Sequence, residues 1–385
     1  MKNILFISTR YPFSIFGGDK LRSSDIIRFL SKKNKIDLIC INKTKKIKKN
    51  PIFCKNIKIF KINFFSKIIN TIFSFLRLQP LQIGFYYSRE MLNYINNIES
   101  KYDTIICHTS RSSQYLPKKF KGKKILEMSD LQSLNYEQSI KQLSFINPLK
   151  YLYIIERLLC IKYERKIFKK FDDIVFASNK DANIAKKKIS YKKKLHVIKI
   201  AHKLNLNLFK FKKINNKIIF IGNLKYLPNK LACNDFVLNI LKKINLKFPE
   251  IKLHLIGDIS FLHKLYLNKF KNVIVHGKVN NLNKVLKNAI CAICNVKIST
   301  GFQTKILTYM SYGIPTIVST NSFEGVNLKK NKELLVYEKN SELIKKIFFL
   351  KENKNIANQL SFNSRKVIGK KYSSNKILSK YEEII

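Results

Sequence analysis

The chain's 385 residues exceed one ordinary domain core and suit two domains of roughly 150–200 residues, and a hydrophobic content of 45% excludes a disordered polymer. Its 75 lysines and arginines against 24 acidic residues give a formal net charge of +51, which favours anionic membranes and anionic small molecules. Because the basic residues run the whole length without a nucleic-acid-binding motif, as a genome rich in A and T would produce, we expect no specific nucleic-acid partner.

Short apolar runs alternate with helical patterns along the first half of the chain. Continuous runs of this length, without polar alternation, favour parallel strands covered on both faces. The strand candidates are residues 2–8, 35–41, 103–108, 123–128, 172–178 and 194–200, and the clearest helical patterns are residues 20–34 and 152–171. A polar connector at residues 202–216 then interrupts the pattern.

The same alternation restarts after the connector. The second set of strand candidates is residues 217–222, 251–257, 272–277, 289–296, 315–320 and 333–338. Two βαβ series separated by a linker predict an α/β protein with two doubly wound domains. Ligands of such domains bind beyond the carboxyl ends of the strands, so the residues just after each strand are the candidates for a site.

The opening strand is too short to be the apolar core of a signal peptide, and Arg10 follows it at once. No run approaches the roughly 18 apolar residues of a spanning helix. We therefore expect no targeting segment and a cytoplasmic protein, with the inner face of the cytoplasmic membrane as the alternative. The segment nearest to a membrane element is residues 60–80, "FKINFFSKIINTIFSFLRLQP", which is interrupted by Lys61, Lys67 and Arg77. It predicts an amphipathic helix that lies either in a membrane interface or in a core with a solvated basic edge.

Three glycine-containing loops follow predicted strands and have a lysine nearby. Glycine lets backbone amides approach a phosphate, and a helix N-terminus adds positive potential. The glycines are Gly17, Gly18, Gly222 and Gly301, and the lysines are Lys20, Lys225 and Lys305. For the Gly17–Gly18 pair alone, an ordinary turn is an equal expectation. The chain has neither G-x-G-x-x-G nor a P-loop, so neither a dinucleotide dehydrogenase nor a P-loop kinase is indicated.

Titratable residues give weaker signals. His108 ends a predicted strand and is a candidate for substrate contact, although a lone histidine is more often structural. The ten aspartates form no D-x-D pair, so we expect no metal, and Asp172–Asp173 is expected to be a solvated pair. The seven cysteines are odd in number and lie mostly in apolar runs, which predicts free buried thiols in a reducing compartment. Cys291 and Cys294 would point to opposite faces of a strand and could not chelate one metal.

Two stretches carry a resemblance to a known family. They are residues 220–237, "FIGNLKYLPNKLACNDFV", and residues 277–326, which run through "STGFQTKILTYMSYGIPTIVST" to "EG". With the N-terminal "P-x-x-x-x-GG" loop and the helix at residues 155–178, they resemble the retaining glycosyltransferases of family four, in the branch of polysaccharide and exopolysaccharide sugar transferases. The resemblance covers nearly the whole chain and implies the GT-B fold, two Rossmann-like domains that face a cleft.

The resemblance implies a role for each matched residue. Gly17 and Gly18 would face the donor diphosphate, and His108 would lie near the transferred sugar. Lys305 would offset the charge that develops on the departing nucleoside diphosphate. The remaining implied donor-site residues are Gly222, Lys225, Gly301, Phe302, Gln303, Thr304 and Thr308. Asp130, after a strand, is a weaker acceptor-side candidate.

The chain departs from the family pattern at two positions. The family usually has two glutamates eight positions apart, where this chain has Thr300 and Thr308. The second glutamate typically holds the nucleotide ribose, and a threonine can offer only one neutral hydroxyl. The "P-N-G" turn after the last N-domain strand is also replaced, by "KIAHKLN". These departures keep open a second function, that of a catalytically inactive binding or partner subunit.

The expected protein is therefore a glycosyltransferase of cell-surface polysaccharide synthesis. It would move a sugar from a nucleotide diphosphate sugar to a saccharide or lipid-linked acceptor, with retention and without a metal or other cofactor. The expected domains are residues 1–205 on the acceptor side, residues 206–366 for the nucleotide sugar, and residues 367–385, with a single helix at about residues 367–383 that packs back on the first domain. Peripheral contact with an anionic membrane is a further expectation.

Overall fold

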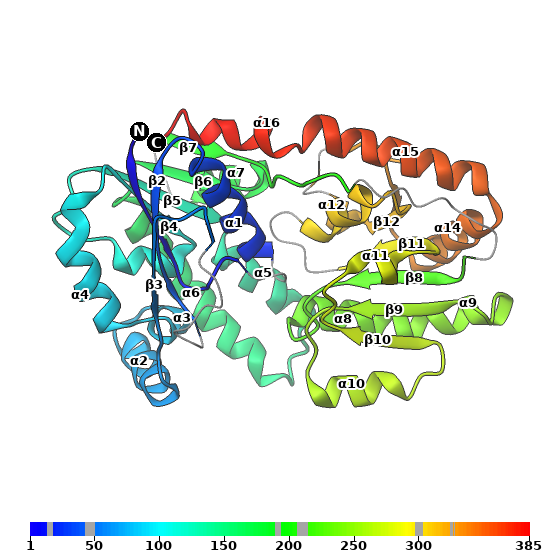
Figure 1. Ribbon diagram of the computed structural model, residues 1–385. Helices are drawn as coiled ribbons and strands as arrows, with labels where there is room; N and C mark the ends of the chain where they lie inside the picture. The colour runs from blue at the N-terminus through cyan, green and yellow to red at the C-terminus, as the bar shows by residue number, and fades with distance from the viewer. Residues whose placement is uncertain are drawn as a thin grey trace. The chain divides into compact units, whose positions relative to one another are not determined.

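A computed structural model of the chain describes residues 1–13, 18–42, 51–188, 194–205, 215–296, 303–323, 326 and 328–385. The chain divides into two compact units (Figure 1). Unit 1 consists of Met1–Ala201 together with Ser374–Ile385, and unit 2 consists of His202–Ser373.

Unit 1 is built on a parallel sheet of seven strands in the order β3-β2-β1-β4-β5-β6-β7. Helices cover both faces of this sheet (Figure 1). The strands are β1 (Asn3–Ser8), β2 (Lys35–Ile41), β3 (Asn56–Phe60), β4 (Thr104–His108), β5 (Lys123–Ser129), β6 (Asp173–Phe176) and β7 (Lys194–Val197). The helices are α1 (Gly18–Leu30), α2 (Phe64–Leu76), α3 (Leu81–Phe85), α4 (Arg89–Ile98), α5 (Gln132–Gln142), α6 (Pro148–Phe168), α7 (Asn179–Lys188) and α16 (Ser374–Leu378), with 3-10 turns at Glu99–Lys101, Ser110–Tyr115 and Ser379–Tyr381.

Unit 2 repeats the arrangement with six parallel strands in the order β10-β9-β8-β11-β12-β13. The strands are β8 (Lys217–Ile221), β9 (Lys252–Ile256), β10 (Val273–Gly277), β11 (Ala289–Cys294), β12 (Thr316–Ser319) and β13 (Leu335–Tyr337). The helices are α8 (Leu227–Asp235), which continues through a π-helical turn (Phe236–Leu241) into α9 (Lys242–Lys247), α10 (Phe261–Asn268), α11 (Leu282–Leu286), α12 (Thr304–Ser311), α13 (Thr320–Phe323), α14 (Asn340–Glu352) and α15 (Lys354–Lys371).

The predicted fold class is confirmed, and each of the twelve predicted apolar runs contains a strand. One strand was not predicted. Its sequence, NIKIF, forms the edge strand β3, whose first three residues are not buried, so no continuous apolar run marks it. The single helix expected at residues 367–383 is wrong. In the structure α15 ends at Lys371 and α16 begins at Ser374.

The strand order reverses once in each unit. In unit 1 the reversal lies between β1 and β4, where Ser8 pairs with His108 at the carboxyl ends. In unit 2 it lies between β8 and β11. A parallel sheet opens a crevice at such a reversal because the two neighbouring crossovers leave in opposite directions. These two strand ends are therefore where a ligand site is expected.

The C-terminal segment Ser374–Ile385 is anchored in unit 1 by a buried polar network. Arg22 of α1 donates from Nε to Glu127 Oε1 over 2.6 Å and from Nη2 to the Ile198 carbonyl over 2.8 Å. The hydroxyl of Tyr381 donates to the other carboxylate oxygen of Glu127. All three side chains are buried, so a charged pair and a tyrosine from distant parts of the sequence satisfy one another inside the unit.

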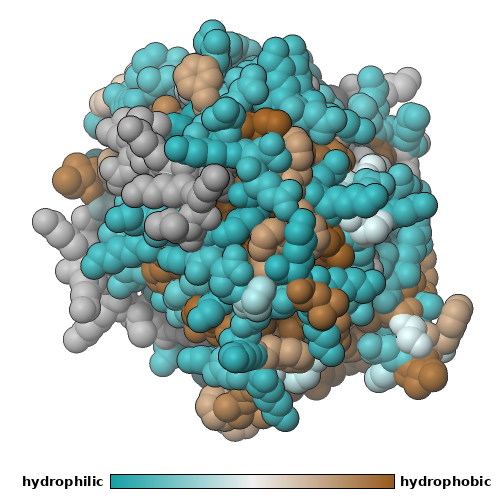
Figure 2. All heavy atoms as spheres, turned by 90° about the vertical axis from the view of Figure 1, so that its right-hand side faces the viewer, coloured by the Kyte–Doolittle hydropathy of each residue, from teal (hydrophilic) through white to brown (hydrophobic). Residues whose placement is uncertain are grey.

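Two further predictions concern the cysteines and the Asp172–Asp173 pair. The seven cysteines are free and buried, as predicted. The solvated pair expected at Asp172–Asp173 is wrong, because Asp173 is buried and pairs with Lys123 and with His196 Nε2, the latter at 2.6 Å. Hydrophilic side chains dominate the face of the molecule in Figure 2, with apolar ones scattered among them, as expected from lysines spread along the chain.

Candidate active site

The unit 2 part of the candidate site forms where β8 ends. Gly222 follows the strand directly, and a Cβ there would lie 3.0 Å from Cγ of Asn229, so only glycine fits without a shift. Asn229 belongs to the first turn of α8, which begins at Leu227 and has Pro228 as its second residue. Its Nδ2 donates to the Asn223 carbonyl over 3.0 Å, which fixes the amide across the strand end and turns its oxygen toward the next element.

That next element is α12, whose second residue is Lys305. The Lys305 ammonium donates to Asn229 Oδ1 over 2.6 Å and lies 4.6 Å from the centre of the Phe220 ring. Its side chain is buried, and burial lowers the pKa of Lys305. No carboxylate among the described residues pairs with it. A buried cation held by only an amide and a ring is costly by itself, so this position favours an anionic ligand.

Backbone amides accompany the lysine. Gln303 precedes the first turn of α12, and its own side chain does not cap that turn. The helix is held against the sheet by the Tyr309 hydroxyl, which accepts from the Ile221 amide over 2.7 Å and donates to the Ile293 carbonyl over 3.2 Å. Tyr309 thus joins the carboxyl ends of β8 and β11 and aims the N-terminus of α12, with its positive potential, at that edge.

Two predicted donor-site residues make other contacts. Lys225 forms an ion pair with Asp258 at 3.2 Å, and Lys278 pairs with the same carboxylate at 3.1 Å. Thr308 donates its hydroxyl to the Thr304 carbonyl over 3.3 Å, within α12. The structure therefore brings Gly222 and Lys305 together through Asn229, while Lys225 is turned toward a surface carboxylate.

Unit 1 has a candidate site of its own, where β1 and β4 end. His108 is buried and stacks on Phe6 with ring centres 6.0 Å apart, and its Nε2 has no hydrogen-bond partner among the described residues. Burial lowers the pKa of His108 to about 4. The imidazole is therefore neutral at pH 7 and has an unused nitrogen, as a group that contacts a substrate hydroxyl would need.

A cluster of two arginines stands beside this histidine. Arg10, after β1, pairs with Asp19 at 3.0 Å and donates from Nη2 to the Tyr86 hydroxyl over 3.0 Å. The Arg111 guanidinium lies 4.9 Å from the centre of the Tyr86 ring and 3.9 Å from the same carboxylate. These residues were not predicted from the sequence to belong to a site. The position of Arg10, just after the strand at the order reversal, was the available signal.

Backbone strain marks the same edge of the sheet. Thr109, which follows His108, has φ 71°, and Ser129, which precedes Asp130, has φ 64°. Non-glycine residues adopt this region rarely, and a β-branched one more rarely still. The Asp130 carboxylate accepts a hydrogen bond from Asn135 Nδ2 over 3.0 Å, and burial raises the pKa of that carboxyl. The strain turns the chain sharply at two neighbouring strand ends of the candidate site.

The remaining predicted residues fall on the edges of these loops. Gly18 begins α1. Gly17, Thr300, Gly301 and Phe302 lie outside the described residues. The predicted roles of all these positions stay predictions.

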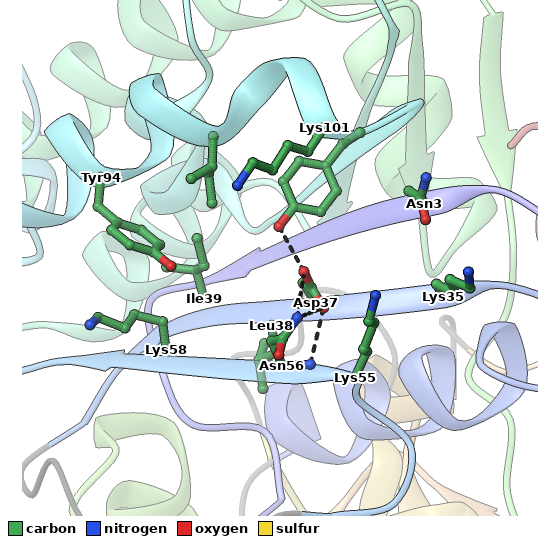
Figure 3. Close-up of a pocket in the computed structure, with 12 residues that line it drawn as sticks. Asn3, Lys35, Asp37, Leu38, Ile39, Lys55, Asn56, Lys58, Tyr94 and Lys101 are labelled. Atoms are coloured by element: carbon green, nitrogen blue, oxygen red, sulfur yellow. Dashed lines mark hydrogen bonds between the residues drawn. The ribbon is translucent and has the colours of Figure 1, made fainter.

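A depression of about 380 Å³ lies elsewhere in unit 1, at the amino ends of β1, β2 and β3 (Figure 3). Asp37 at its centre is satisfied by the Tyr102 hydroxyl at 2.8 Å and by the backbone amide of Asn56 at 3.0 Å. Four lysines surround it, namely Lys35, Lys55, Lys58 and Lys101. The depression lies at the amino ends of the strands, whereas the candidate site lies at their carboxyl ends, so the depression is not part of the candidate site.

Within the described ranges, no three histidine, cysteine, aspartate or glutamate side chains come together as metal ligands would. No helix in those ranges is both long enough and apolar enough to cross a bilayer.

Replacing His108 with glutamine is expected to weaken the acid sensitivity of folding. Between its ordinary pKa of 6.5 and the folded value of about 4, His108 binds a proton only when the chain is unfolded, so it contributes a loss of stability as pH falls through that window. The free energy of unfolding in urea should therefore drop by about 2 kcal/mol less between pH 7 and pH 5 in His108→Gln than in the unsubstituted protein. The other histidines contribute equally to both proteins, and equal drops would contradict a neutral buried His108.

Comparison with known proteins agrees with this architecture. Residues 215–353 match the family model described as glycosyl transferases group 1. That match spans β8 to β13, including the Gly222, Asn229 and Lys305 contacts. No curated protein is similar to the chain at the level of sequence.

Solved structures are similar over the whole chain. Sucrose-phosphate synthase from Thermosynechococcus elongatus superposes with a TM-score of 0.72 at 12% identity, covering 100% of this chain and 98% of that one. The Anabaena protein HepE in complex with UDP and glucose gives 0.69 at 13% identity, covering 100% and 99%. A TarM variant from S. aureus in complex with Fondaparinux, alpha-GlcNAc-glycerol and UDP gives 0.70 at 10% identity, again covering 100% and 99%. The two parallel sheets with their helices match GT-B glycosyltransferase structures, and the chain has this fold.

Proposed function

We propose that this protein transfers a sugar from a nucleoside diphosphate sugar to a saccharide or lipid-linked acceptor. The observation that carries the proposal is the buried Lys305 ammonium. It lies at the N-terminus of α12, beside the end of β8, and has no carboxylate partner among the described residues. A diphosphate would supply the negative charge that this position lacks. Lys305 also lies within residues 215–353, the region that matches group 1 glycosyl transferases.

Sugar transfer requires the protein to stabilise the negative charge on a departing nucleoside diphosphate. As the bond between the anomeric carbon and the phosphate oxygen breaks, negative charge grows on that oxygen. The Lys305 ammonium and the amides that begin α12 would stabilise this charge as it grows, without rearranging, because Asn229 holds Lys305 and Tyr309 holds α12 in place. We propose that these groups suffice without a metal, and that the new bond retains the configuration of the old one.

Unit 1 would supply contacts to the sugars. Neutral His108 can accept or donate one hydrogen bond through Nε2, which suits a hydroxyl better than a phosphate. Arg10 and Arg111 add positive charge near the same strand ends. We place the acceptor here, and we place the protein in the cytoplasm in a pathway of cell-surface polysaccharide synthesis.

Thermal unfolding with a panel of nucleoside diphosphates tests the proposal. HepE has been solved with UDP, with UDP-glucose and with UDP plus glucose, so the uridine compounds are tried first. At 100 times its dissociation constant a ligand stabilises a protein by about 2.7 kcal/mol, which corresponds to a rise in Tm of roughly 5–10 °C for a domain of this size. No rise with any nucleotide at millimolar concentration would overturn the proposal. Transfer activity in EDTA and the anomer of the product, read by proton NMR, test the metal and the stereochemistry.

The second candidate is an inactive GT-B protein that binds a ligand or partner. The observation in its favour is Thr308, whose hydroxyl is used within α12 in a position where the resemblance implies a glutamate on the ribose. Nucleotide binding without donor hydrolysis or transfer to any acceptor would favour this candidate over the enzyme.

A further inference from the structure

The helix α2 has an unusual division of its residues. At 100° per residue, the eight phenylalanines, isoleucines and leucine of Phe64–Leu76 fill one half of the helix surface. The other half holds only Ser66, Lys67, Asn70, Thr71 and Ser74. A helix of a soluble protein normally buries the apolar half.

In α2 the polar half is the one that packs on the protein. Ser74 is the buried residue of the helix, and its hydroxyl donates to the Pro80 carbonyl over 3.0 Å. Asn70 Nδ2 donates to the Tyr87 carbonyl over 3.2 Å. Gly84 of α3 lies against this face so closely that a Cβ there would come within 2.0 Å of the Asn70 carbonyl oxygen. Small and polar residues therefore dock α2 onto α3.

The apolar half is consequently left on the surface. Phe65 is 75% exposed, Phe64 70% and Leu76 69%, and the other large apolar residues of the helix are exposed as well. We call the outward residues Phe64, Phe65, Ile68, Ile72, Phe73 and Leu76 the α2 face. In Figure 1 α2 lies at the lower side of unit 1, as does the start of α6. Phe145 and Ile146, which precede α6 in the chain, are also exposed.

All charged residues in the part of the sequence that surrounds α2 are basic. Between Asp37 and Glu90 the chain has nine lysines and two arginines and no acidic residue. Lys67, on the edge of the helix, lies 5.0 Å from the centre of the exposed Phe85 ring, so its ammonium stands beside the apolar surface. A partner that covers this face must accept both apolar side chains and cations.

An anionic bilayer fits these requirements better than a protein partner. The α2 face has no hydrogen-bonding side chain, whereas protein interfaces carry about one hydrogen bond per 100–200 Å². A second copy of this chain would bring its own net charge of +51 against the first. A helix with an aromatic and aliphatic face and flanking lysines lies in the plane of a membrane interface, with the cations at the lipid phosphates.

We propose that the α2 face docks unit 1 onto an anionic lipid surface. The helix lies parallel to the bilayer, its phenylalanines and isoleucines enter the headgroup region, and its polar half stays bound to α3. The contact does not depend on sugar transfer. Delivery to a lipid-linked acceptor would be its consequence, and that consequence rests on the proposed function.

Flotation of the full chain with lipid vesicles tests the proposal. We expect the protein to float with vesicles of phosphatidylcholine and 30% phosphatidylglycerol, and to float less with phosphatidylcholine alone or at high salt. Phe65→Glu with Ile72→Glu should lower binding to the anionic vesicles at least tenfold. The matched control is Phe362→Glu with Leu246→Glu, which changes one exposed phenylalanine, one exposed aliphatic residue and the net charge equally. This control should bind as the unsubstituted protein does.

Circular dichroism and activity keep the result interpretable. Because Phe65 and Ile72 are exposed, their replacement should leave the melting curve and donor hydrolysis unchanged, so a loss of flotation with folding intact is specific. Equal binding by the α2 and control variants would overturn the proposal, as would failure of the unsubstituted protein to float with either lipid. So would a stable dimer in light scattering that the α2 variant converts to monomer, since that would assign the face to a second copy. Loss of donor hydrolysis in every protein would count against the proposed function alone.

Discussion

Lys305→Met is expected to lower kcat/KM for sugar transfer by at least 100-fold and to leave the unliganded protein folded. Removing one preorganised donor from a developing oxyanion costs on the order of 100- to 1000-fold in rate, and Lys305 supplies a full charge in a buried place. The ammonium has no carboxylate partner among the described residues, so methionine of similar length replaces an uncompensated buried cation. The Tm without nucleotide should therefore stay within a few degrees of the original or rise.

The measurement pairs initial rates with calorimetric titration of the nucleoside diphosphate. Weaker nucleotide binding and a lower rate, with an unchanged fold, would place Lys305 on the diphosphate. Lys264→Met on α10 is the matched control, because that lysine is exposed and lies outside the candidate site. Full activity and full nucleotide affinity in Lys305→Met would remove the residue from the mechanism.

Arg22→Met is expected to lower the free energy of unfolding of unit 1 by about 3–5 kcal/mol. The substitution leaves the carboxylate of Glu127 buried with only hydroxyl partners, Tyr381 and Ser129. It also removes the donor to the Ile198 carbonyl, which loses a bond of 2.8 Å. An uncompensated buried charge is far costlier than the loss of a surface ion pair.

Urea unfolding of the single and double variants separates this effect from packing. Arg22→Met combined with Glu127→Leu removes both charges, and much of the lost stability should return. Arg89→Met is the control, since that arginine is exposed at the start of α4. If Arg22→Met unfolds at the same urea concentration as Arg89→Met, the buried network does not hold the C-terminal segment in place.

Both sheets could be predicted because their strands are continuous apolar runs. A strand such as Ala289–Cys294, buried along its whole length, needs apolar residues at every position, and that need is visible in the sequence. The edge strand β3 has no such requirement and was missed. The terminal helix was misplaced at residues 367–383, because helical composition continues across the break between α15 and α16.

The candidate site could be predicted only as separate residues at strand and helix ends. Gly222, His108 and Lys305 were selected because each ends or follows a strand or lies in the first turn of a helix. Their partners were not, because Asn229 lies 76 residues before Lys305 and carries no signal of its own. Arg10, Tyr86 and Arg111 likewise meet only after three segments have folded together.

The segment at residues 60–80 shows most clearly what each level of information decides. The sequence by itself determined that it forms an amphipathic helix, because its apolar residues recur with the period of a helix and local capping by Asn63 begins it. Whether the apolar half faces a core or the outside was open. Tertiary structure decided it, because Gly84 admits only the small polar half of α2 at a close helix contact, and the apolar half must then face outward.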